Sequence, residues 1–324
     1  MKPRFDPTRC IFLTLLACAA ASALGAQVAT YDGACDASAA VALDGRHFIV
    51  GNDETNTLAV YQRGQPAPVA TVELGRFLGV GAKDEADIEG AAPIGKRIYW
   101  ITSHARDSKG RARPDRQRFF ATEVVAGATP HVAPVGRPYA RLLDDLLAAP
   151  ALAPYGLAAA ARLPAEAEGG LNIEGLAATP DGRLLIGLRN PLSHGKALLI
   201  PLENPAEVID SGQRARLGAP IELELGQRGI RSIDLVGDVY YVVTGPPADR
   251  GSFALYRWSG KAQEAPTPVP GVSLGDLRPE AMFAVPGSGE LQLISDDGGL
   301  RVGGSECKDL PTARQTFRSL TLRP

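Results

Sequence analysis

Acidic residues open a set of related segments along this chain of 324 residues. The segments read DIEGAAPIGKRIYW, NIEGLAATPDGRLLIG, SIDLVGDVYYVV and RPEAMFAVPGSGELQL. Carboxylates that converge on one place need a cation, protons or arginines as compensation, and an all-oxygen set suits Ca²⁺ or Mg²⁺ better than zinc. The pattern predicts a divalent-metal site with the candidate ligands Glu89, Glu174, Asp234 and Glu280. Glu89, Glu174 and Glu280 are also the candidate catalytic groups.

Basic and polar residues follow the apolar run of each segment or lie beside its acidic residue. Arg106, Arg189 and Arg231 carry planar guanidinium groups that suit a phosphate or a carboxylate. Together with His104 and Asp296 they form the predicted substrate-binding set. Two structural alternatives stay open: the arginines pair with glutamates of neighbouring repeats, and His104 is a solvated loop residue.

The segments that carry these residues are copies of one repeat. The copy over 172–191 joins a small-residue strand to an aliphatic strand through Pro180-Asp181-Gly182, a tight-turn signal. Successive aliphatic strands are 50, 86, 55 and 52 residues apart, beginning at Phe48, Ile98, Leu184, Val239 and Leu291. Repeats of about 50 residues with several short strands predict a β-propeller, in which the first strand of each blade lines a central channel.

The repeat count predicts an all-β fold with five blades. The one long gap contains an Ala/Leu-rich stretch over 137–170, which indicates a short helical insertion. Six blades stay open as an alternative if this insertion hides strands, and a β-sandwich is the alternative that leaves the repeats unexplained. Thr316–Leu322 is the predicted final strand, and the Pro-rich run over 265–270 is a predicted connection.

The hairpin geometry predicts where the polar residues gather. The start of one strand and the end of the next lie at the same edge of an antiparallel hairpin, so the acidic and basic sets share one mouth of the channel. The loop Asn52-Asp53-Glu54 reaches the same mouth. Gly90 and Gly175, which follow two of the glutamates, allow close packing on the opposite side of the strand.

The N-terminus reads as a secretory signal peptide over 1–26, with a basic start, an apolar stretch and a small-residue ending. A lipoprotein cleavage box ending at Cys18 is the alternative, and it would leave a lipid anchor on that cysteine. Either route predicts export to the periplasm or the extracellular space. No later stretch is apolar enough to predict a membrane span.

Cleavage after residue 26 leaves Cys35 before the first repeat and Cys307 after the last. Because the first and last blades of a closed ring are neighbours, and because an oxidising compartment permits it, these cysteines are predicted to form a disulfide. Two unpaired thiols are the alternative. The net charge of −2 argues against a nucleic-acid partner, and we expect a monomer.

The stretches DIEG, NIEG and RPEA, with LRNP and GKALLIPLENP downstream, resemble a bacterial family of exported proteins described as a domain of unknown function. That family is similar to the secreted propellers grouped under esterase-like activity of phytase. The resemblance covers nearly the whole mature chain. It implies a propeller fold and metal-assisted hydrolysis, and it implies no particular substrate.

These observations predict an exported propeller that hydrolyses an ester or phosphoester of a small anionic substrate with the help of Ca²⁺ or Mg²⁺. A metal-free pair of carboxylates acting on a glycoside is a variant of this prediction. A non-catalytic propeller that binds a ligand or a protein on the same face is the alternative from another class, because the fold alone does not decide function.

Overall fold

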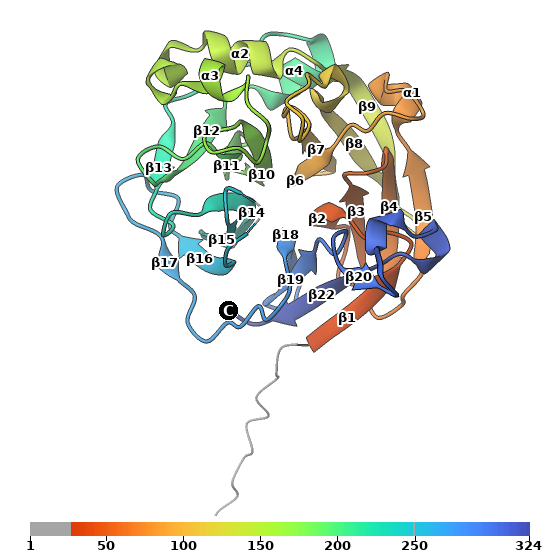
Figure 1. The fold of residues 1–324 in the computed structure, drawn as a ribbon. Coiled ribbons are helices and arrows are strands. Elements are labelled where there is room, and N and C mark those ends of the chain that lie inside the picture. Colours follow the sequence, from red (N-terminus) through yellow and green to blue (C-terminus); the bar gives the residue numbers. More distant parts are fainter. Residues whose placement is uncertain (1–26, 249) are drawn as a thin grey trace, which may run out of the picture.

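The computed structural model describes residues 27–248 and 250–324, which form five four-stranded antiparallel sheets set around a central channel (Figure 1). The prediction of a five-bladed β-propeller is therefore confirmed. The predicted signal peptide and the alternative lipid site at Cys18 lie outside the described residues. No helix within the described ranges is long and apolar enough to cross a membrane.

Four of the blades are meanders in which strand order follows chain order from the channel outward. The first contains β2 (Ala37–Ala42), β3 (His47–Asn52), β4 (Thr57–Gln62) and β5 (Pro68–Glu73). The second contains β6 (Ile88–Ile94), β7 (Arg97–Thr102), β8 (Phe119–Val125) and β9 (His131–Tyr139). The third contains β10 (Asn172–Ala178), β11 (Leu184–Asn190), β12 (Ala197–Leu202) and β13 (Ile221–Leu223). The fourth contains β14 (Gly229–Val236), β15 (Val239–Gly245), β16 (Ala254–Trp258) and β17 (Thr267–Pro268).

The fifth blade combines both ends of the described chain. Its strands from the channel outward are β18 (Pro279–Val285), β19 (Glu290–Ser295), β22 (Thr316–Leu322) and β1 (Gln27–Asp32). The prediction for Thr316–Leu322 is right as the last strand of the chain, but β1 pairs outside it and completes the sheet. Tyr31 of β1 is buried and stacks on Phe317 with ring centroids 5.4 Å apart. Strand β1 pairs with a strand from the other end of the chain and not with a neighbour in sequence. It therefore carries no hairpin signal, and the repeat pattern does not reveal it.

A disulfide joins Cys35, between β1 and β2, to Cys307, 272 residues later, with 6.0 Å between the two Cα atoms. The predicted pairing is confirmed. It adds a covalent closure to the same junction that β1 closes by strand pairing. A disulfide of this kind is compatible with export to an oxidising compartment.

The long gap between the second and third blades holds helices and no named strand within the described residues, so the six-bladed alternative is wrong. These helices are α2 (Leu142–Ala148), η2 (Pro150–Tyr155) and α3 (Leu157–Ala160), and they lie at the outer rim of the ring (Figure 1). The insertion begins after β9, a little later than the sequence predicts. Leu142 and Leu157 bury their side chains in one apolar cluster with Leu184 of the third blade.

The remaining short elements lie in the connections. They are α1 (Gly75–Leu78), η1 (Pro114–Arg116), α4 (Pro205–Ser211), β20 (Arg301–Val302), β21 (Ser305–Glu306), η3 (Cys307–Asp309) and η4 (Thr312–Arg314). The prediction that the Pro-rich run over 265–270 is only a connection is partly wrong, because this run supplies the two-residue outer strand β17. A proline is tolerated there because an edge strand leaves one row of backbone donors unpaired.

Candidate functional site at the channel mouth

Each innermost strand has a register irregularity near its start, which leaves one residue outside the regular pairing. Such a bulge bends the strand and redirects a side chain. The five residues in this position are Ser38, Glu89, Glu174, Arg231 and Glu280. One residue per blade therefore forms an inner ring at the same end of the channel.

Asp234 does not belong to this ring. It pairs with Tyr241 near the far end of β14, and its carboxylate accepts a hydrogen bond from the backbone N–H of Ala284 at 3.1 Å. The expectation that Asp234 lies at the mouth is wrong, and Arg231 occupies the equivalent position. Ile230-Arg231-Ser232 is the structural match to Ile173-Glu174-Gly175, and Asp234, the acidic residue of this repeat, lies three positions later in the strand.

The inner ring borders a cavity of about 580 Å³ with strongly polar walls. Its charged lining comprises ten acidic and six basic residues: Asp36, Asp53, Glu54, Asp87, Glu89, Glu166, Glu174, Glu280, Asp296 and Glu306, with Arg116, Arg189, Arg231, Arg250, Arg278 and Lys308. The first two blades contribute mainly carboxylates to the lining, with Arg116 as their one guanidinium group, whereas the later blades add the guanidinium groups of Arg189, Arg231 and Arg278. The cavity therefore has an acidic side and an arginine side.

On the arginine side the predicted glutamates are ion-paired. Arg231 Nε lies 3.0 Å from Glu174 Oε2, and its Nη2 contacts Glu280 Oε1. Arg189 Nη1 lies 3.0 Å from the other oxygen of Glu174. All four side chains are buried, and burial lowers the pKa of Arg231 while the Glu174 carboxylate opposes that change. Glu174 and Glu280 are thus already compensated by protein cations, as one of the alternatives from the sequence states.

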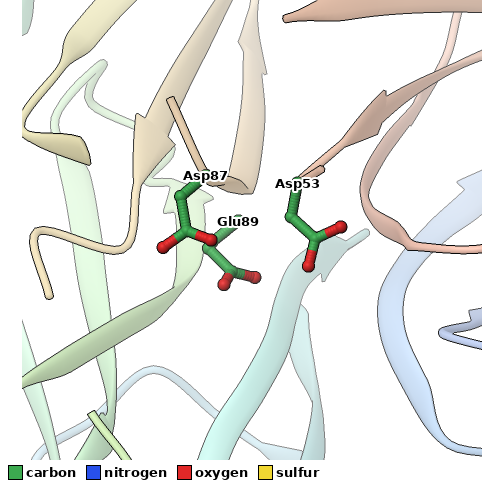
Figure 2. A group of neighbouring side chains, drawn as sticks. All are labelled: Asp53, Asp87 and Glu89. Carbon is green, nitrogen blue, oxygen red and sulfur yellow. The ribbon is translucent and has the colours of Figure 1, made fainter. Parts of the chain in front are cut away.

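On the acidic side three carboxylates converge, and among the described residues only one of them, Asp87, has an arginine partner, Arg116. Oxygens of Asp53, from the loop after β3, and of Asp87 and Glu89, from the start of β6, lie within 4.8 Å of one another (Figure 2). Glu89 is only 7% exposed, and among the described residues its Oε2 has no hydrogen-bond partner. Oδ1 of Asp53 also has no hydrogen-bond partner among the described residues. We call these three residues the acidic triad.

Burial and mutual repulsion disfavour the charged forms of the triad. Burial, Glu174 and Asp87 raise the pKa of Glu89 well above its usual range, and burial and Asp36 do the same for Asp53. Burial raises the pKa of Asp87 to about 6, although Arg116, whose Nη1 lies 3.0 Å from Asp87 Oδ2, opposes the rise. A divalent cation at this place would relieve both effects, because it would satisfy the buried oxygens and supply positive charge.

The other predicted binding residues divide into two groups. Asp296 lines the cavity, together with Arg189 and Arg231. His104 is 2% exposed and does not line the cavity, so it is neither a site residue nor a solvated loop residue. The Arg106 guanidinium donates to the backbone oxygens of Ala161 and Gly110, which ties the β7–β8 loop to the helical insertion.

Sequence reasoning missed two of the three triad members as ligands. Asp87 is the first residue of DIEG, two positions before Glu89, and Asp53 lies in a loop expected at the same mouth. The signals were therefore present. What the sequence does not contain is the distance between the first two blades, which brings Asp53, in the loop after β3, close to Asp87, just before β6.

Several solved enzyme structures are similar to this chain. The glutaminyl cyclase of Myxococcus xanthus is 15% identical, with 91% of this chain and 96% of that chain covered and a TM-score of 0.47. The PQQ-bound aldose sugar dehydrogenase of Streptomyces coelicolor is 13% identical, with 92% and 98% covered and a TM-score of 0.42. The virginiamycin B lyase of Staphylococcus aureus is 8% identical, with 92% and 99% covered and a TM-score of 0.40. These similarities carry no argument about activity.

No curated protein matches this chain in sequence. A family described as "Protein of unknown function (DUF3616)" matches residues 36–126 and 136–286. The matched ranges include the whole acidic triad and both ion-paired glutamates, Glu174 and Glu280. Because these ranges cover most of the chain, the protein belongs to the DUF3616 family.

Proposed function

We propose that this protein binds a divalent cation, Ca²⁺ or Mg²⁺, at the acidic triad and hydrolyses an ester or phosphoester of a small anionic substrate in the cavity above it. The observation that carries the proposal is the convergence of three carboxylates within 4.8 Å, with buried oxygens of Glu89 and Asp53 that lack hydrogen-bond partners among the described residues. The sequence resemblance to secreted propellers with esterase-like activity of phytase supports the same class of reaction.

In this proposal, different residues of the cavity lining bind the cation, bind the anionic group of the substrate and donate a proton. A cation held by Asp53, Asp87 and Glu89 would polarise a substrate oxygen and lower the pKa of a bound water. Arg278 and Arg250, both exposed in the cavity lining, provide positive charge for the anionic group of the substrate. Asp36 is buried in the same lining, and burial together with Asp296 raises its pKa to about 8, so it holds a proton that can pass to the leaving oxygen.

The arginine side has a positioning role in this proposal. Arg231 bridges Glu174 and Glu280 from the blade between theirs, and Arg189 holds Glu174 from the second strand of the same blade. This buried network keeps three inner strands in register at the mouth. The role of Glu174 and Glu280 is therefore to hold the arginines rather than to bind the metal, since both carboxylates are already ion-paired.

Thermal unfolding of the mature protein tests the metal site. After treatment with EDTA, restored Ca²⁺ or Mg²⁺ is expected to raise the melting temperature in a saturable way, because a ligand that binds only the folded state stabilises it by about 2.7 kcal/mol at 100 times its Kd. Glu89→Gln and Asp53→Asn are expected to abolish the rise. Glu306→Gln, a cavity carboxylate outside the triad, is the matched control and is expected to keep it.

Two results contradict the metal site: no response of the natural protein to either cation, or an undiminished response in Glu89→Gln. A screen of esters and phosphoesters with the cation-loaded protein then tests hydrolysis. The second candidate function is non-catalytic ligand binding, which the ion pairs of Glu174 and Glu280 favour because these two predicted catalytic carboxylates are engaged by Arg189 and Arg231. Substrate binding without turnover identifies that function.

A further inference from the structure

A second hollow opens beside the central cavity, between the third and fourth blades. We define this side compartment by Ala167, Asn190, Leu192, Pro246, Pro247 and Ala248; its volume is about 600 Å³. It shares Glu166, Pro246 and Arg250 with the lining of the central cavity, so the two hollows adjoin. Both volumes are in the range that holds small organic ligands.

Two consecutive side chains at the end of β11 hold the walls of this compartment. Asn190 Nδ2 donates to the carbonyl oxygens of Ala165 and Ala167, at 3.1 and 2.8 Å, and so fixes the loop that follows the helical insertion. Arg189 donates from Nε to Pro246 O and from Nη2 to Ala248 O, each at 3.2 Å, and so fixes the β15–β16 loop. Both side chains are buried, with 2% of Asn190 and 8% of Arg189 exposed.

The side compartment differs in chemistry from the central cavity. Leu192 is half-buried against the apolar cluster of the third and fourth blades, and Pro246, Pro247 and Ala248 form the facing wall. Of its charged lining residues, Glu166 and Arg250 also line the central cavity, and Glu168 is exposed. Phe253 of the same β15–β16 loop lines the central cavity with a half-buried aromatic ring. The centroid of this ring lies 5.4 Å from Cζ of the Arg231 guanidinium.

From this arrangement we infer that the side compartment holds the uncharged part of the substrate, and that this part is an apolar alkyl or aryl group. The inference rests on the proposed function, which places the anionic group in the central cavity. Arg189 couples the two hollows, since the same guanidinium that holds the β15–β16 loop also pairs with Glu174 of the inner ring. The favoured substrate class is thus an anionic ester with an apolar substituent, and sugar phosphates are disfavoured.

Binding of two phosphonates, which are not hydrolysed, tests this inference. Isothermal titration of the cation-loaded protein is expected to show phenylphosphonate binding about tenfold or more tightly than methylphosphonate, because the ring removes additional apolar surface from water. Leu192→Ser is expected to bring the two affinities within about threefold by weakening phenylphosphonate alone. Leu163→Ser, at an exposed leucine of the insertion, is the matched control and is expected to retain the preference.

Ala248→Glu serves as a second variant should Leu192→Ser fail to fold, since Ala248 is exposed and its carbonyl contact with Arg189 is retained. Equal affinities for both phosphonates in the natural protein overturn the inference while leaving the proposed function standing. A preference that survives Leu192→Ser or Ala248→Glu also overturns it. If the cation binds but neither phosphonate does, the anionic substrate of the proposed function fails, and this inference fails with it.

Discussion

His104 shows how burial turns a candidate site residue into a structural one. Its backbone has a φ of 55°, which residues other than glycine adopt rarely. Its Nδ1 donates to the backbone oxygen of Thr102 at 2.8 Å, and among the described residues its Nε2 has no hydrogen-bond partner. Burial lowers the pKa of His104 to about 4, so the ring is neutral at pH 7.

A depressed pKa in the folded state makes stability fall as the pH falls. The unfolded chain binds a proton at His104 near its ordinary value of about 6.5, and the folded chain does so only near 4. Stability from this residue is thus complete above pH 6.5 and is lost between 6.5 and 4. Between pH 8 and 5 the natural protein is expected to lose about 2 kcal/mol more than His104→Asn, whose asparagine tolerates positive φ.

Urea unfolding at a series of pH values measures this difference. His131→Asn is the control, since His131 is exposed at the start of β9 and its replacement is expected to leave the pH profile unchanged. Parallel profiles for His104→Asn and the natural protein would show that His104 titrates normally in the folded state.

At the scale of elements, small residues set how closely the innermost strands approach one another. A Cβ added at Gly175 of β10 would lie 2.7 Å from Ile230 Cγ2 of β14, the innermost strand of the next blade. A Cβ at Gly90 of β6 would lie 3.0 Å from the Glu174 backbone oxygen of β10. The sequence-based expectation of close packing beside the two glutamates is therefore confirmed, and this packing brings the charged residues of neighbouring blades within ion-pair distance.

Replacing Gly175 by alanine is expected to force the third and fourth blades apart and to destabilise the fold by about 1–3 kcal/mol. Thermal and urea unfolding measure the loss. Gly127→Ala is the matched control, because the nearest atom to its added Cβ is 3.5 Å away and its φ is not positive. Equal stabilities of the two variants would mean that the blades have room to accommodate the methyl group.

At the scale of the whole molecule, the ring is closed twice at one junction. Strand β1 pairs with β22 over Gln27–Asp32. The disulfide links Cys35, shortly after the end of β1, to Cys307. The residues next to the cysteines, Asp36 and Lys308, line the central cavity. Closure of the ring and the shape of the acidic side are therefore properties of the same segment.

Removing the disulfide in Cys35→Ala/Cys307→Ala is expected to lower the free energy of unfolding by up to about 5 kcal/mol, because the bond closes a loop of 272 residues and restricts the unfolded chain. Thermal unfolding with and without a reductant measures the effect. The reductant is expected to lower the melting temperature of the natural protein and to leave the double variant unchanged. A reductant effect of the same size in both proteins would assign the loss to something other than this bond.

The sequence by itself determined the architecture and part of the site. Strand-sized apolar runs at regular spacing require repeated sheets, and the position of Glu89, Glu174 and Glu280 at the start of the innermost strands follows from the repeat. The disulfide follows as well, because a closed ring brings its first and last repeats together. These are properties of local pattern and chain order, which the sequence contains directly.

Only the tertiary structure decided which charges meet. Arg231, predicted from the sequence as a substrate-binding residue, enters the ring through a bulge in the position assigned to Asp234, and it neutralises Glu174 and Glu280 across two blade boundaries. Glu89 instead faces Asp53 and Asp87, so the proposed metal site lies at the first two blades and not at the ring of predicted glutamates. The physical reason is that ion pairing and metal binding depend on distances of a few ångströms between strands far apart in the chain, and blade packing and strand bulges set those distances.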